Sequence, residues 1–197
     1  MIDVSAITGK QKLIIAKGLC DYSYIMDNWQ NNDADFKDVY YGFYLKARWA
    51  AMNLPGNKNP YFNKLQSINT TDNFMDILDD LKNTMDAGSY EFSLGSKLLH
   101  TRNPQMPIYD SKVRDYLTAE EDVDFWWHHS PRVRGASRKM TERQKIEHDW
   151  NKLKAWYDSF LPSTRGREWI QWFDTNFPAY SQISDVKKID FIIFATR

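Results

Sequence analysis

Hydrophobic residues recur every three or four positions along most of this chain, which is the pattern of amphipathic helices. The strict alternation typical of half-buried strands is hard to find anywhere. The pattern predicts helices over residues 9–19, 36–52, 71–85, 93–100, 111–117, 141–160, 167–177 and 184–195, with a short one after Pro60. The sequence therefore predicts an all-α fold, a compact bundle of several helices.

Local signals at helix ends support this interpretation. Pro55 and Gly56 are expected to end the second helix, and Thr71 and Asp72 are reasonable caps for the helix that follows. No internal repeat, low-complexity tract or clear linker interrupts the pattern. We expect a single α-helical domain over residues 1–197, or two lobes with a cleft near residues 93–115.

The composition is that of an ordered globular protein. Of 197 residues, 42% are apolar and 26% charged, with only 8 Gly and 7 Pro, which excludes disordered and collagen-like classes. Aromatic residues reach 15%, enough to build a bulky core or to stack flat partners such as nucleobases. Four tryptophans fall on helical stripes and are expected in the core: Trp150, Trp156, Trp169 and Trp172.

Cysteine and histidine usage argues against metal and disulfide chemistry. Cys20 is the one cysteine, so neither an intramolecular disulfide nor a Cys-rich zinc site is expected. His128, His129 and Asp124 lack the usual spacing of zinc ligands. The sequence also shows no signal-peptide pattern or membrane-spanning apolar run. We therefore expect a cytoplasmic protein without a metal, a cofactor or a membrane partner.

Charge is balanced overall and uneven along the chain. The totals are 26 basic and 26 acidic residues, whereas residues 126–197 carry 13 basic and 8 acidic ones. A concentrated basic run directly follows Trp126 and Trp127, and it includes Arg132, Arg134, Arg138 and Lys139. Such a run suits contacts to a DNA backbone, with the tryptophans stacking on bases. The alternative is a solvated loop beside two core tryptophans.

The segment 92–110 carries the most specific chemistry. Lys97 follows Gly95 and Ser96 at the expected start of a short helix, and Asp110 comes thirteen residues later at the start of the next helix. Backbone N–H groups at helix starts bind anions. A lysine held at such a place is a usable nucleophile, and a carboxylate can stabilise a positively charged sugar.

The order Gly-Ser-Lys, helix, Pro-Ile-Tyr-Asp-Ser resembles the helix-hairpin-helix DNA glycosylases, closest to the 8-oxoguanine branch and its bacterial look-alikes. The resemblance implies that Lys97 attacks the sugar of a flipped nucleotide and that Asp110 is the catalytic carboxylate. Gly95 would be the hairpin glycine that approaches a DNA phosphate, with Ser96 beside it. The implied partner is double-stranded DNA, and the implied reaction is base excision, with or without strand cleavage.

An aromatic pocket would receive the flipped base, and we expect it to include Tyr109, Trp126 and Trp127. Simpler roles stay open for several residues: Asp110 is a good helix cap, Lys97 suits a solvated surface, and His100 suits a helix C-terminal cap. Two other functions also stay open. The chain could be a non-catalytic nucleic-acid-binding module on the same scaffold, or a helical protein-interaction domain.

Overall fold

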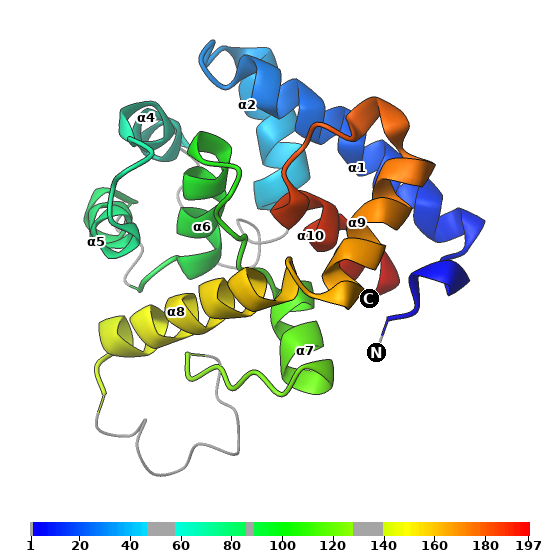
Figure 1. Ribbon diagram of the computed structural model, residues 1–197. Coiled ribbons are helices and arrows are strands. Elements are labelled where there is room, and N and C mark those ends of the chain that lie inside the picture. The colour runs from blue at the N-terminus through cyan, green and yellow to red at the C-terminus, as the bar shows by residue number, and fades with distance from the viewer. Residues whose placement is uncertain (1, 47–57, 86–88, 128–139) are drawn as a thin grey trace. The chain divides into compact units, whose positions relative to one another are not determined.

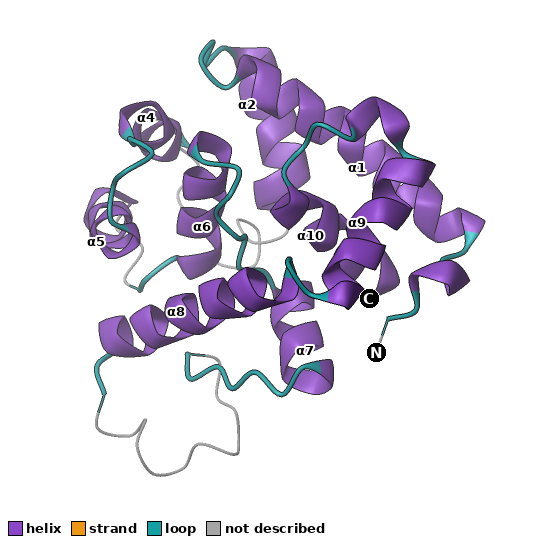
Figure 2. Ribbon diagram, in the orientation of Figure 1, coloured by secondary structure: helices purple, strands orange, loops and turns teal. Residues whose placement is uncertain are grey.

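The computed structural model describes residues 2–46, 58–85, 89–127 and 140–197. All regular elements within these ranges are helical, as Figures 1 and 2 show. The predicted all-α fold class is confirmed. The chain divides into two compact units, one formed by Met1–Lys12 with Pro104–Arg197 and the other by Leu13–Asn103.

The unit Leu13–Asn103 contains most of α1 (Gly9–Asn28), then α2 (Ala34–Tyr40), a π-helical turn η2 (Tyr41–Leu45), α4 (Asn59–Ser67), α5 (Phe74–Met85) and α6 (Phe92–Arg102). Aromatic rings fill its interior. Tyr40 packs against Tyr61 with ring centroids 6.0 Å apart and against Phe62 at 5.7 Å. All three side chains are at most 1% exposed, so the high aromatic content of this unit serves its core.

The unit Met1–Lys12 with Pro104–Arg197 contains η1 (Val4–Ala6), α7 (Ser111–Glu120), α8 (Glu142–Phe160), α9 (Thr164–Asn176), η4 (Pro178–Tyr180) and α10 (Asp185–Thr196). Polar side chains cap its helices: Thr141 forms a capping box with Gln144 at α8, and Ser163 and Ser184 cap α9 and α10.

The predicted core tryptophans are confirmed in three cases and corrected in one. Trp150, Trp156 and Trp169 are buried. Trp172 is only partly buried, and the Nζ of Lys12 lies over its ring at 5.8 Å. The buried apolar stripe of α9 therefore includes Trp169 but not Trp172, which the periodicity had placed in the core.

Several predicted boundaries are wrong. The first helix continues to Asn28, beyond residue 19. The helix expected from Thr71 begins at Phe74, because Asn73 caps it by accepting a hydrogen bond from the Met75 backbone N–H at 2.8 Å. The Asp72 carboxylate instead accepts from the Asn69 N–H at 2.9 Å and closes the preceding turn. Pro55 and Gly56 lie outside the described residues.

The junction between α8 and α9 is unusually close. Gly166, in the first turn of α9, sits so near the end of α8 that a β-carbon there would overlap the carbonyl oxygen of Phe160. Its backbone N–H donates to the Ser163 hydroxyl at 3.0 Å. Only a glycine fits this approach without a shift of backbone atoms.

Candidate functional site

Lys97 lies in the middle of α6, one helical turn after Ser93. Its Nζ donates a hydrogen bond to the Ser93 hydroxyl at 3.0 Å. The side chain is 7% exposed. Lysine is almost never buried to this degree without a specific reason, so the alternative of a solvated surface lysine is wrong.

Gly95 and Ser96 do not form the turn that the sequence suggested, because α6 already begins at Phe92. The Gly95 N–H donates to the Glu91 carbonyl at 2.9 Å, as in any helix interior. A β-carbon on Gly95 would overlap the side chain of Leu78, so the glycine permits close packing of α6 on α5. Both residues are buried, and the expected phosphate contact through a hairpin turn loses its structural basis.

His100 contacts a residue far away in the sequence. It is fully buried two residues before the end of α6, and its Nε2 lies 3.1 Å from the Tyr22 hydroxyl. His100 lies in the last turn of α6, and the Tyr22 hydroxyl is a partner that the sequence did not predict. Its imidazole joins α6 to α1 within the unit Leu13–Asn103.

Asp110 caps α7, as the sequence predicted. Its Oδ1 accepts a hydrogen bond from the Val113 N–H at 2.9 Å. Burial raises the pKa of Tyr157 on α8 well above its usual value, and the negative charges of Asp190 and Asp110 raise it further. Asp110 therefore lies within electrostatic reach of a buried phenol of its own unit. Lys97 and Asp110 belong to different units, and each is described within its own.

Tyr109 is a core residue. It is 2% exposed and packs edge-on against Phe125 with ring centroids 5.7 Å apart. Burial raises the pKa of its hydroxyl far above the ordinary value, and the nearby Asp149 charge adds to that shift. A side chain this enclosed does not suit the wall of an open base pocket, so that expectation for Tyr109 is corrected.

Trp126 and Trp127 share one buried carboxylate. Asp149 of α8 is 0% exposed and accepts hydrogen bonds from the Trp126 N–H at 2.6 Å and the Trp127 N–H at 2.8 Å. The Nδ1 of His148 lies 3.2 Å from the same carboxylate. Burial raises the pKa of Asp149 in spite of these hydrogen bonds. Both tryptophans are partly exposed, as a role in stacking requires.

The indole ring of Trp126 also has two partners of its own. It stacks on the His148 imidazole with ring centroids 3.5 Å apart and an interplanar angle of 6°. Its Nε1 donates to Asp124 Oδ2 at 3.2 Å. No spacing in the sequence pairs residue 126 with residue 148. The nearest signal was a histidine and an aspartate that interrupt the apolar pattern of the predicted helix 141–160.

The four basic residues expected to contact DNA, Arg132, Arg134, Arg138 and Lys139, lie outside the described residues.

Sequence analysis did not identify a buried pair of opposite charges in α10. Lys187 and Asp190 of α10 are both buried, with Nζ and Oδ2 2.5 Å apart. The available signal was a lysine and an aspartate three residues apart in a helix whose second half is mostly apolar.

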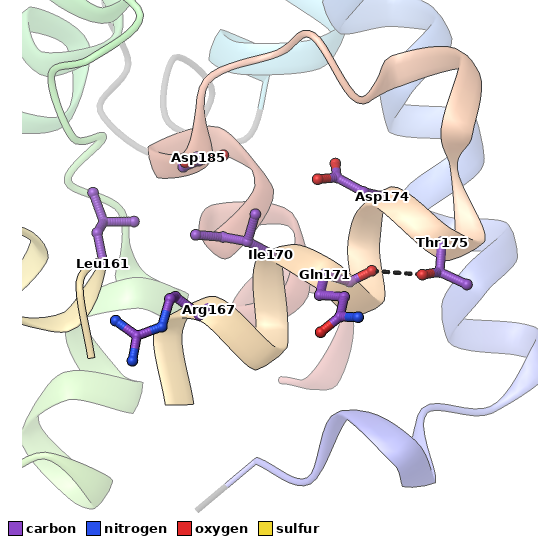
Figure 3. A pocket seen from close by; sticks show the side chains of 7 residues that line it. All are labelled: Leu161, Arg167, Ile170, Gln171, Asp174, Thr175 and Asp185. Atoms are coloured by element: carbon purple, nitrogen blue, oxygen red, sulfur yellow. Dashed lines mark hydrogen bonds between the residues drawn. The ribbon is translucent and has the colours of Figure 1, made fainter. Parts of the chain in front are cut away.

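Figure 3 shows an open hollow of about 620 Å³ on the unit that contains α9 and α10. It is lined by Leu161, Arg167, Ile170, Gln171, Asp174, Thr175 and Asp185. Lys188 bridges its two carboxylates, with Nζ 2.9 Å from an oxygen of each. Arg167 donates to the Pro162 carbonyl. The charged groups of this hollow are therefore occupied with protein partners.

No described helix has the length and apolar character needed to cross a lipid bilayer. Within the same part of the chain, no group of three or more histidine, cysteine or acidic side chains is placed to hold a metal ion.

Comparison with protein-family models, with curated proteins and with solved structures finds no match to this chain. The resemblance to the helix-hairpin-helix glycosylases therefore rests on the residues of the segment 92–110.

Proposed function

We propose that this chain acts on DNA as an N-glycosylase, with Lys97 as the nucleophilic amine and Asp110 as the supporting carboxylate. The observation that supports the proposal most is the burial of Lys97 beside the Ser93 hydroxyl. Lysines that form covalent intermediates with sugars or carbonyl carbons are desolvated ones, because a solvated ammonium group is a poor nucleophile.

In the proposed reaction, the neutral Lys97 amine attacks C1′ of the flipped nucleotide. The N-glycosidic bond breaks, its electron pair leaves with the base, and the base takes up one of the two protons of the attacking nitrogen. Positive charge develops on the sugar during this step, and the Asp110 carboxylate stabilises that charge. The C1′–O4′ bond then breaks, the ring oxygen takes up the remaining proton of the nitrogen, and a Schiff base forms between C1′ and the lysine nitrogen.

Borohydride trapping tests this proposal directly, because reduction converts a lysine Schiff base into a stable covalent adduct. The protein is incubated with duplex oligonucleotides that carry either an abasic site or 8-oxoguanine. We expect an adduct with wild type and none with Lys97→Met, which keeps the aliphatic volume inside α6 and removes the amine. Lys17→Ala is the matched control, because Lys17 is an exposed lysine of the same unit.

Asp110→Asn separates chemistry from capping, since asparagine caps a helix about as well as aspartate. We expect this variant to fold normally, to form an adduct at an abasic site, and to lose about 100-fold or more of its rate on an intact nucleotide.

Two results would overturn the proposal. One is an adduct that persists in Lys97→Met, and the other is the lack of an adduct on both substrates in a wild-type protein that binds them. The second result, with salt-sensitive binding retained, would favour a non-catalytic nucleic-acid-binding module.

A further inference from the structure

Trp126 is held at three points, one on its backbone and two on its side chain, by residues of its own unit. Its backbone N–H is held by the buried Asp149 carboxylate, its ring N–H by Asp124, and one face of its indole by the His148 imidazole. The partners on α8 are adjacent residues of a regular helix. Trp126 therefore loses little conformational freedom when a ligand contacts it.

The arrangement also leaves part of the ring accessible. Trp126 is partly exposed, while most other large aromatic side chains of this unit are buried, including Tyr109, Tyr116, Trp156 and Trp169. His148 itself is 20% exposed and shields one face of the indole. A rigid indole with one covered face and some exposed surface is suited to receive a second flat ring.

The part of the sequence that contains Trp126 has an excess of basic residues, which favours a nucleobase as this second ring. Residues 126–197 carry 13 basic and 8 acidic side chains, against 13 basic and 18 acidic in residues 1–125. A stacking surface within the basic part of a chain suits a nucleobase, whose strand carries one phosphate per nucleotide. Every base can stack on an aromatic ring, so this contact does not depend on base identity. The base must first be unstacked from its neighbours in the strand.

We propose that Trp126, backed by His148 and positioned by Asp149 and Asp124, is a preorganised platform on which one unpaired base of a DNA strand stacks. This inference rests on the proposed function in taking DNA as the ligand. It adds the conformation of the bound nucleotide and assigns positioning roles to three residues that the glycosylase resemblance does not include.

Binding of a short fluorescein-labelled oligothymidylate, followed by fluorescence anisotropy at fixed salt, tests the platform. Trp126→Leu should weaken binding about tenfold, the range expected for the loss of one base–aromatic stack. Trp126→Phe should retain most of the affinity because it keeps a flat face. His148→Phe should likewise bind more tightly than His148→Ala, since only the former keeps a ring behind the indole.

Trp29 provides a matched control, because it is a partly exposed tryptophan whose face is already covered by the Arg102 guanidinium at 3.8 Å from the ring centroid. Trp29→Leu should bind as wild type. If a Trp126 variant does not fold, a second measurement on the wild-type protein still tests the platform. Oxidation of tryptophans by N-bromosuccinimide, read by peptide mass spectrometry, should be slowed at Trp126 and unchanged at Trp29 when the oligothymidylate is saturating.

The outcomes distinguish this inference from the proposed reaction. Wild-type affinity in Trp126→Leu, unprotected Trp126 at saturation, or no binding of the oligothymidylate would each overturn the platform, even if a Lys97 adduct forms. Conversely, Trp126-dependent binding without any adduct would support the platform and count against the glycosylase chemistry.

Discussion

Asp110 combines a structural and a proposed chemical role in one carboxylate. Because its Oδ1 satisfies the Val113 N–H at the start of α7, Asp110→Ala should lower the free energy of unfolding by about 1 kcal/mol. Asp110→Asn should leave stability nearly unchanged. Urea unfolding of the two variants checks this, and an equal loss in both would mean that the charge, and not the cap, stabilises the fold.

Asp149 gives a pH-dependent contribution to stability whose sign follows from its burial. Burial raises its pKa above the ordinary 3.8, so the folded state binds the proton more tightly than the unfolded state. The contribution of Asp149 therefore becomes more stabilising as the pH falls toward and through its folded pKa, and it is smallest near neutral pH.

The measurement compares unfolding free energies with and without Asp149→Asn, both in a His148→Phe background that lacks the imidazole beside the carboxylate. The stability difference in favour of Asp149 should grow between about pH 7 and pH 4. A difference that shrinks over this range would show that the carboxylate is stabilised, and not penalised, in the folded state.

At this scale the sequence predicted contacts that are local and missed those that are distant. The Asp110 cap links residues three apart and could be read from residue types. The contact of His100 with Tyr22 joins residues 78 apart, and that of Asp149 with the Trp126 N–H joins residues 23 apart. Such pairs depend on how helices pack, which a single sequence does not encode in any fixed spacing.

Glycines at helix contacts make the packing of elements testable. Gly166→Ala should cost about 3 kcal/mol, because the new methyl group meets the Phe160 carbonyl and backbone atoms yield poorly. Gly95→Ala should cost less, about 1 to 2 kcal/mol, because it meets the terminal methyl of Leu78 and gains helix propensity.

Gly42 is the control for both substitutions, since a β-carbon there meets no atom within 4 Å. Gly42→Ala should be neutral or stabilising by up to about 1 kcal/mol. Thermal and urea denaturation give the three values. Equal effects at Gly95 and Gly42 would mean that α5 and α6 do not pack as closely as described.

The predicted helix boundaries agree closely for α6 and α8, whereas the first helix was expected to end at Leu19 and continues to Asn28. In α6, Phe92, Leu94, Lys97 and His100 are all buried although they point in different directions around the helix axis. Hydrophobic periodicity marks a helix with one wet face, so it does not account for the agreement between the predicted range 93–100 and Phe92–Arg102. The C-terminal end of this helix was instead indicated by Asn103 and Pro104, which follow it directly. Helix α8 has a solvated face, and its predicted range 141–160 agrees with Glu142–Phe160 to within one residue.

For the whole molecule, the proposed DNA contact predicts a strong dependence of affinity on salt. Replacing Arg132, Arg134, Arg138 and Lys139 by Gln should reduce the slope of log affinity against log salt by about 3 to 4, if each side chain neutralises one phosphate of duplex DNA. The control replaces exposed Lys17 and Lys46 of the other unit and should leave the slope unchanged. An unchanged slope in the fourfold variant would contradict the predicted DNA-binding role of the basic run.

The division into two units was not evident from composition. One boundary, between Lys12 and Leu13, falls inside the continuous helix α1, and the other falls between α6 and α7 at Asn103 and Pro104. Linkers are usually recognised by flexible or polar composition, and a boundary within a helix has neither.

Asp149 accepts hydrogen bonds from two backbone N–H groups, and this should change how fast those amide hydrogens exchange with solvent. Trp126 and Trp127 lie in an irregular segment, where amide hydrogens normally exchange with deuterium within moments. Here both amides point at a carboxylate that water does not reach. Deuterium uptake at these two amides should therefore be slow, although neither residue belongs to a helix. Asp149→Asn should abolish this protection from exchange.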